Sequence, residues 1–151
     1  MLLSNKPFIE HYNWHPEQPV QFTVLDRETG EVVSRSEADP FFAFHHVNAF
    51  ESGDEIVLDC STYPDASVLD DLYLDDLRAE NSTFETLAES ELRRYRVPID
   101  GGVAEGETLY SGGYDLPAIH YREYNTRPYE YAYGLSSNEN RSDDFSTSSS
   151  R

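Results

Sequence analysis

Cysteine, lysine and long apolar runs are nearly absent from this sequence of 151 residues. The single cysteine, Cys60, excludes an internal disulfide framework and a zinc site built from cysteines alone. No apolar run is long enough for a transmembrane helix, and the apolar start at Met1–Leu3 is too short for a signal peptide. We therefore expect one modest domain in the cytoplasm, either free or at the periphery of a membrane.

Positive charge is also scarce, because 11 basic residues face 29 acidic ones and the formal net charge is -18. Nucleic acid and anionic membrane surfaces attract positive charge, so the composition argues against both as electrostatic partners. Lys6 is the only lysine, and the other basic residues are arginines. A dense carboxylate surface stays hydrated in concentrated salt, which also screens its self-repulsion. The composition favours a halophilic protein over the alternative of an ordinary acidic one.

Helical periodicity is weak, whereas aromatic and β-branched residues gather in short runs separated by turn residues, which is typical of an all-β fold. Periodicity alone does not choose between a small sandwich, a barrel and part of a propeller. A Ser-rich tail over 136–151 is expected to be disordered, because it has little apolar surface to bury. Short helices are expected over 67–78 and 82–90, and a loose glycine-rich region over 101–113. Strands are predicted over 20–24, 31–36, 41–50, 55–60, 92–99, 114–124 and 129–135.

The segment Phe41–Phe50 carries two adjacent histidines and is apolar on both alternating faces, as in a strand buried on both sides. In a strand, His45 shares its face with Ala43 and Ala49, whereas His46 lies among large aromatic residues. A metal-bound imidazole needs space for the metal, so His45 is the better ligand candidate and His46 is expected to pack. The alternative is that both are ordinary histidines of a buried strand.

The same segment resembles a known family motif. Residues 44–51 resemble the F-H-x-x-N-A-[YF]-E motif of the carotenoid cleavage oxygenases. Four further stretches resemble family motifs in the same order: L-Y-L-x-x-L-R at 72–78, L-R-R-Y at 92–95, E-x-P-x-I-N-Y at 114–121 and K-P-Y-x-Y-x-Y-G at 127–134. We therefore expect an oxygenase segment over 19–135, after a poorly matched segment 1–18 and before the tail at 136–151.

The resemblance implies a seven-bladed β-propeller, of which this chain would form about two to three blades. In this family four histidines from different blades hold Fe(2+) on the propeller axis, and His45 matches one of them. Asp115 matches a glutamate that accepts a hydrogen bond from an iron-bound histidine, a contact that orients the imidazole and raises its basicity. Aspartate is one methylene shorter than glutamate, so its carboxylate must approach the His45 imidazole more closely to make the same hydrogen bond.

The function implied by the resemblance is oxidative cleavage of a carotenoid or apocarotenoid double bond by a non-haem Fe(II) dioxygenase using O2. This chain would be a fragment, inactive alone, because the other iron histidines would lie in missing blades. Its partner would then be the missing N-terminal part of a split enzyme. The alternative is a non-catalytic acidic β-module, a propeller remnant with a binding role or none.

The remaining candidates are expected to be structural. His11 and His15 match no ligand motif of the family, and His120 stands where the family usually has asparagine. Cys60, on a predicted strand, is expected to be a small buried apolar residue and not a redox centre.

If the acidic composition is an adaptation to salt, the free energy of unfolding should fall sharply as salt is lowered from about 1 M to about 0.1 M. The screening length grows over that range from about 3 Å to about 10 Å, so neighbouring carboxylates begin to repel one another. Urea unfolding at a series of KCl concentrations measures the effect. A free energy of unfolding independent of salt would favour the ordinary acidic protein.

Overall fold

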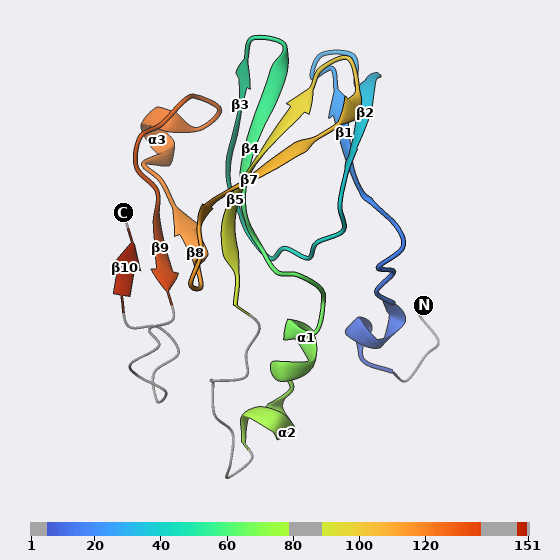
Figure 1. Ribbon diagram of the computed structural model, residues 1–151, viewed down its shortest axis with the longest axis vertical. Helices are drawn as coiled ribbons and strands as arrows, with labels where there is room; N and C mark the ends of the chain where they lie inside the picture. Colours follow the sequence, from blue (N-terminus) through green and yellow to red (C-terminus); the bar gives the residue numbers. More distant parts are fainter. Residues whose placement is uncertain (1–5, 79–88, 137–147, 151) are drawn as a thin grey trace.

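The computed structural model describes residues 6–78, 89–136 and 148–150, and strands dominate it (Figure 1). In the described ranges the strands are β1 (Val20–Leu25), β2 (Val32–Ala38), β3 (His46–Ser52), β4 (Glu55–Thr62), β5 (Glu91–Pro98), β6 (Gly102–Val103), β7 (Glu105–Tyr110), β8 (Asp115–Ala118), β9 (Tyr133–Ser136) and β10 (Ser148–Ser150). The all-β prediction is confirmed.

The strands form three sheets. The central sheet has the order β3-β4-β5-β7 and is antiparallel throughout. Figure 1 shows the sheet with order β1-β2-β6 on one side of these strands, and the sheet β10-β9-β8 on the other. The chain thus passes from one small sheet to the next, except that β6 returns to pair with β2 in parallel.

The face of the central sheet toward β1 and β2 is apolar. Cys60 on β4 and Tyr95 on β5 are buried there, and Phe22 of β1 packs against them. The rings of Phe22 and Tyr95 lie 5.3 Å apart, and Phe41 stacks on Tyr95 at 4.9 Å. Burial raises the pKa of the Cys60 thiol to about 12, so this cysteine is the buried apolar residue that the sequence predicts.

The opposite face of the central sheet packs against the segment from Tyr114 to β9. Val47 of β3 and Leu92 of β5 form a cluster there with Tyr114 and Ile119. Because alternate residues of a strand point to opposite faces, β5 contributes to both cores, with Leu92 on this face and Tyr95 on the other. The middle of the central sheet is therefore covered on both sides, whereas the residues of its edge strand β7 are exposed.

A buried carboxylate lies in this second face. Asp59 on β4 has no exposed surface and accepts two hydrogen bonds, each of 2.8 Å, from the guanidinium of Arg94 directly across on β5. The Tyr129 hydroxyl donates a third hydrogen bond to Asp59. These bonds raise the pKa of Arg94, and burial followed by the bond to Asp59 raises the pKa of Tyr129. Asp59 therefore connects the central sheet to the segment before β9.

The described helices are single turns: η1 (Phe8–His11), α1 (Val68–Asp71), α2 (Leu74–Leu77) and α3 (Tyr121–Tyr124). α1 and α2 lie in the connection between β4 and β5, where the sequence predicts a short helix over 67–78. The helix expected over 82–90 falls almost wholly outside the described residues. In the part of the chain that the structure describes, every helix is too short to cross a membrane.

The prediction of one continuous strand over 41–50 is wrong. β3 begins only at His46, and before it only Phe42 bridges to Tyr63. Between these contacts the chain has one residue more (42–46) than its partner (60–63), so it bulges away from β4. A second irregularity follows at Val47, where the register shifts. The regular alternation that the sequence argument assumed is therefore broken on both sides of His46.

Three other boundaries differ from expectation. The glycine-rich stretch 101–113 holds β6 and β7, because pairing with β2 and β5 orders it. The strand expected over 114–124 ends at Ala118 and gives way to α3, and β9 occupies only the end of 129–135. The prediction of a disordered tail lies mostly outside the described residues and stays a prediction; within them, Ser136 ends β9 and Ser148–Ser150 pair with β9.

Arg94→Met should lower the free energy of unfolding by about 3–5 kcal/mol, because it leaves the buried Asp59 carboxylate without its counter-charge. Arg96→Met is the matched control on the same strand. Its pair with Glu55 is 3.3 Å long and exposed (44% and 38%), so its loss should cost less than about 1 kcal/mol. Urea unfolding at fixed salt compares the two. Equal losses would show that Asp59 does not depend on Arg94.

Candidate metal centre

His45 and Asp115 meet although they are 70 residues apart in sequence. His45 Nδ1 lies 2.7 Å from Asp115 Oδ1, with side chains 43% and 21% exposed. An ionised carboxylate only accepts hydrogen bonds, so Nδ1 carries the proton and donates it. In the neutral imidazole the lone pair is then on Nε2, the nitrogen left to bind a metal. The structure thus brings together the two residues that the resemblance pairs; the metal role of His45 stays a prediction.

The bulge before β3 places His45. The His45 carbonyl accepts a hydrogen bond from the Ser61 N–H of β4 at 3.0 Å, which holds the backbone at the end of the bulge. The ring of Phe44 lies 6.2 Å from that of His45, so a phenylalanine stands beside this imidazole. The face argument had placed small residues beside His45 and phenylalanines beside His46. Its premise was a regular strand, which the bulge removes.

His46 does not pack as expected, because its side chain is exposed at the start of β3. His15 and His120 are also exposed, and each lies beside a glutamate of its own segment, Glu17 at 3.0 Å and Glu123 at 3.2 Å. Within the ranges that the structure describes, no group of three or more His, Cys, Asp or Glu side chains gathers to hold a metal ion. Among the described histidines, His45 is the one whose ring nitrogen contacts a carboxylate from a distant segment of the chain.

Asp115 is placed by the residues on either side of it. The Tyr114 N–H donates to the Ser90 hydroxyl at 2.8 Å, and the Tyr114 carbonyl accepts hydrogen bonds from the hydroxyls of Ser61 and Ser90. Leu116 has φ 48°, a left-handed conformation that costs a non-glycine residue about 1 kcal/mol or more. That turn directs the Leu116 N–H to Asp115 Oδ1 at 2.7 Å. The backbone strain is therefore coupled to the orientation of the carboxylate.

Tyr63, which the sequence analysis did not single out, completes the surroundings of Asp115. Its hydroxyl donates to Asp115 Oδ2 at 2.7 Å, and the residue is buried, with 8% of its surface exposed. Burial, and next the hydrogen bond to Asp115, raise the pKa of this phenol well above its usual range. Tyr63 follows the end of β4 and lies outside the matched motifs, so sequence reasoning had no signal for it.

Asn48 of the F-H-x-x-N motif has a clear structural role. Its amide donates to the carbonyls of Tyr124 at 2.9 Å and Arg127 at 3.0 Å. Its oxygen accepts from the Thr126 N–H at 3.1 Å, where Thr126 has φ 61°. One buried asparagine therefore holds the turn that follows α3, and this turn connects β8, where Asp115 lies, to Tyr129.

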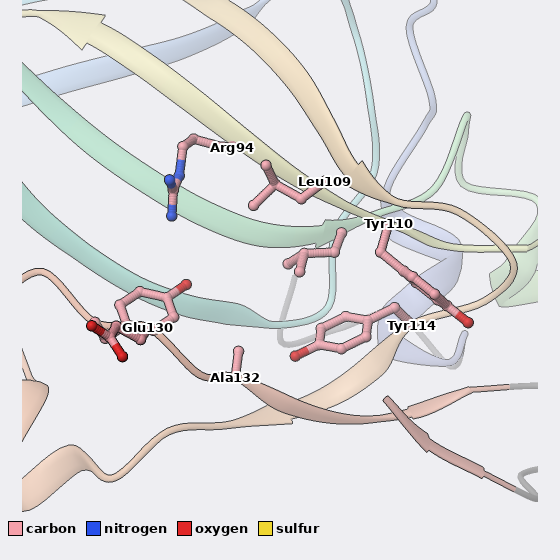
Figure 2. Close-up of a pocket in the computed structure, with 8 residues that line it drawn as sticks. Arg94, Leu109, Tyr110, Tyr114, Glu130 and Ala132 are labelled. Carbon is pink, nitrogen blue, oxygen red and sulfur yellow. The ribbon is translucent and has the colours of Figure 1, made fainter. Parts of the chain in front are cut away.

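A pocket of about 220 Å³ opens beside Arg94 and Tyr129, the two partners of Asp59. It lies between β5 and β7 on one side and the chain before β9 on the other (Figure 2). Arg94, Tyr110, Tyr114 and Ala132 are among the residues drawn around it. Tyr114 is 2% exposed, and its hydroxyl has no hydrogen-bond partner within the described residues. The two sheets therefore do not close completely over this face.

Comparison with known proteins identifies the family. The family model "Retinal pigment epithelial membrane protein" (RPE65) matches residues 1–150. The chain belongs to this family. The carotenoid isomerooxygenase of Galleria mellonella is 30% identical over 139 residues, which cover 89% of this chain and 27% of that protein. The apocarotenoid-15,15'-oxygenase of Synechocystis is 31% identical over 124 residues, which cover 82% and 24%.

Solved structures of the RPE65 family have the same fold over this region. A cobalt-substituted apocarotenoid oxygenase (ACO) of Synechocystis aligns with a TM-score of 0.67 and 28% identity, covering 85% of this chain and 26% of that one. An ACO/RPE65 chimera aligns with a TM-score of 0.64 and 26% identity, covering 85% and 26%. The predicted partial β-propeller is confirmed. The chain spans about a quarter of the length of these relatives.

Asn48→Ala should lower the free energy of unfolding by about 2–3 kcal/mol, because three hydrogen bonds are lost and buried backbone groups remain unpaired. Asn125→Ala is the control: it removes an exposed amide from the same turn and should change stability by less than about 0.5 kcal/mol. Urea unfolding measures both. Similar losses for the two variants would contradict the role assigned to Asn48.

Proposed function

We propose that this chain is part of an enzyme that cleaves a double bond of a carotenoid or apocarotenoid with O2. Membership of the RPE65 family supports this, and the similar proteins are named as a carotenoid isomerooxygenase and an apocarotenoid oxygenase. The observation that carries the proposal for this chain's own residues is the 2.7 Å contact between His45 Nδ1 and Asp115. It leaves Nε2 as the free acceptor of a neutral imidazole, the form in which histidine binds metals.

We propose Fe(2+) as the metal. Neutral imidazole suits ferrous iron, and a relative has been crystallised with cobalt substituted into it, which supports a metal site in the family. When bound, the iron supplies activation of O2 for cleavage of the polyene. In this chain His45 would hold the metal through Nε2, and Asp115 would keep the proton on Nδ1. Phe44 would limit the movement of the imidazole from the side.

A single imidazole does not hold Fe(2+) firmly in water, so the site needs further ligands from outside the described residues. The described residues supply one candidate ligand, and the relatives are about four times as long as the matched region. We therefore propose that the remaining part of the fold supplies the other ligands and the cover for the substrate. By itself, the 151-residue chain should be inactive on carotenoids.

The test uses a chimera in which residues 19–134 replace the matching segment of the Synechocystis oxygenase. Exchange within this family is compatible with folding, because an ACO/RPE65 chimera has been crystallised. The chimera should bind iron stoichiometrically, measured by metal analysis of the purified protein, and cleave apocarotenoid. His45→Ala should abolish iron loading. His46→Ala is the matched control and should retain iron, because His46 is exposed and the contact with Asp115 is made by His45.

Asp115→Asn keeps the shape of the side chain but removes its charge. Loss of a residue that hydrogen-bonds a metal-bound histidine typically weakens metal binding by roughly 10–100-fold, and we expect the same loss of iron affinity here. Retention of iron by His45→Ala together with its loss in His46→Ala would overturn the assignment of the ligand. A folded chimera that carries no iron with His45 intact would favour the non-catalytic β-module.

A further inference from the structure

We propose that Tyr63 is a positioning residue for the metal centre: by holding the second oxygen of Asp115, it fixes which nitrogen of His45 carries the proton. The inference rests on the proposed function in one respect only, namely that a metal uses Nε2. The statement about the proton concerns this chain without any metal.

The argument begins with the two oxygens of Asp115. Oδ1 accepts from His45 Nδ1 and from the Leu116 N–H, both at 2.7 Å. Oδ2 accepts from the Tyr63 hydroxyl, also at 2.7 Å. Turning the carboxylate about its Cβ–Cγ bond moves both oxygens, so the two donors on Oδ1 already oppose it. The Tyr63 hydroxyl adds the only donor on Oδ2 among the described contacts, so turning must break bonds at both oxygens. Tyr63 therefore sets the plane of the carboxylate.

Tyr63 is itself held firmly. Its backbone exchanges both hydrogen bonds with Phe42, at 3.0 Å and 2.7 Å, which anchors it across the bulge. Its ring meets that of Phe44 edge to face, with centroids 5.6 Å apart. Phe44 also lies beside the ring of His45 at 6.2 Å. The same phenylalanine thus backs both the phenol and the imidazole, so their hydroxyl and Nδ1 face one carboxylate from fixed positions.

The consequence is a single neutral form of His45. Of the two nitrogens of the His45 ring, only Nδ1 faces a carboxylate held in this plane, so the proton stays on Nδ1 and Nε2 remains free. Without the Tyr63 hydroxyl the carboxylate turns more easily because only the donors on Oδ1 remain, the bond to Nδ1 weakens, and the form with the proton on Nε2 becomes accessible. That form cannot bind a metal through Nε2. A purely structural tyrosine would affect stability but not the position of this proton.

The experiment is long-range 1H–15N NMR of the histidine rings in the metal-free 151-residue chain at about pH 9, where an ordinary imidazole is neutral. The 15N shift distinguishes a protonated from an unprotonated ring nitrogen. In the parent chain His45 should be protonated at Nδ1. In Tyr63→Phe the two His45 nitrogen shifts should move toward each other, as in a mixture of both forms. An unchanged pair of shifts in a folded Tyr63→Phe chain would overturn the proposal.

Tyr121→Phe is the matched control. The Tyr121 hydroxyl donates to the Val47 carbonyl at 2.9 Å, so this variant removes a phenol hydrogen bond near the site without touching Asp115. It should leave the His45 shifts as in the parent. If Tyr121→Phe moves them as far as Tyr63→Phe does, the effect is general loosening and the proposal is wrong.

A second measurement covers the case in which Tyr63→Phe fails to fold. In the parent chain the Tyr63 hydroxyl proton should be visible as a slowly exchanging resonance, since a buried phenol that donates to a carboxylate is protected from water. A hydroxyl that exchanges too fast to be seen overturns the proposal. In the iron-binding chimera, Tyr63→Phe should weaken iron binding by about tenfold and Tyr121→Phe should not. Failure of the chimera to bind iron would contradict the proposed function, while the metal-free NMR result would stand.

Discussion

The buried carboxylate of Asp59 is the interaction on which the packing of the sheets depends. It lies in the middle of β4, fully shielded from water, and is neutralised by Arg94 across the strand pair. Burying an ionised carboxylate without a partner costs several kcal/mol, so Asp59 needs both Arg94 within the central sheet and the Tyr129 hydroxyl from the neighbouring segment. Removing water from Asp59 is thus possible only when the segment before β9 is in place.

The candidate metal centre depends on the same docking. Asp115 begins β8, which pairs with β9, so the carboxylate reaches His45 only if β8 and β9 lie against the central sheet. Asn48 on β3 holds the turn between these two strands, and the Tyr114 backbone is held by hydroxyls of Ser61 and Ser90. Each of these polar contacts lies between the central sheet and the segment from Tyr114 to β9. The chain therefore uses hydrogen bonds, in addition to apolar packing, to set the relative position of two neighbouring sheets.

The position of His45 follows from irregular backbone and not from regular strand geometry. A bulged chain turns one side chain toward the neighbouring sheet without disturbing the pairing that resumes at His46. Leu116 contributes a second irregularity on the facing strand, with its left-handed backbone next to Asp115. Strained or bulged backbone at such positions is common where a side chain must be aimed. Here both partners of one hydrogen bond, His45 and Asp115, are presented in this way.

The sequence by itself determined the all-β class, the burial of Cys60 and the family, because these depend on composition and on the order of motifs along the chain. The resemblance to the family also implied the pairing of His45 with Asp115, and the structure showed that the shorter aspartate reaches the imidazole. It predicted strand residues in β1, β2, β4 and β5, where alternation is regular. It failed at 41–50, 101–113 and 114–124, because bulges and strand ends are decided by the partner strand and not by the local pattern. Only the tertiary structure showed the hydrogen bond from Tyr63 to Asp115 and those from Asn48 to the turn after α3. Both contacts join residues that are more than 50 positions apart in the sequence. Residues so distant meet only after the sheets have packed, and nothing in their own segments records that meeting.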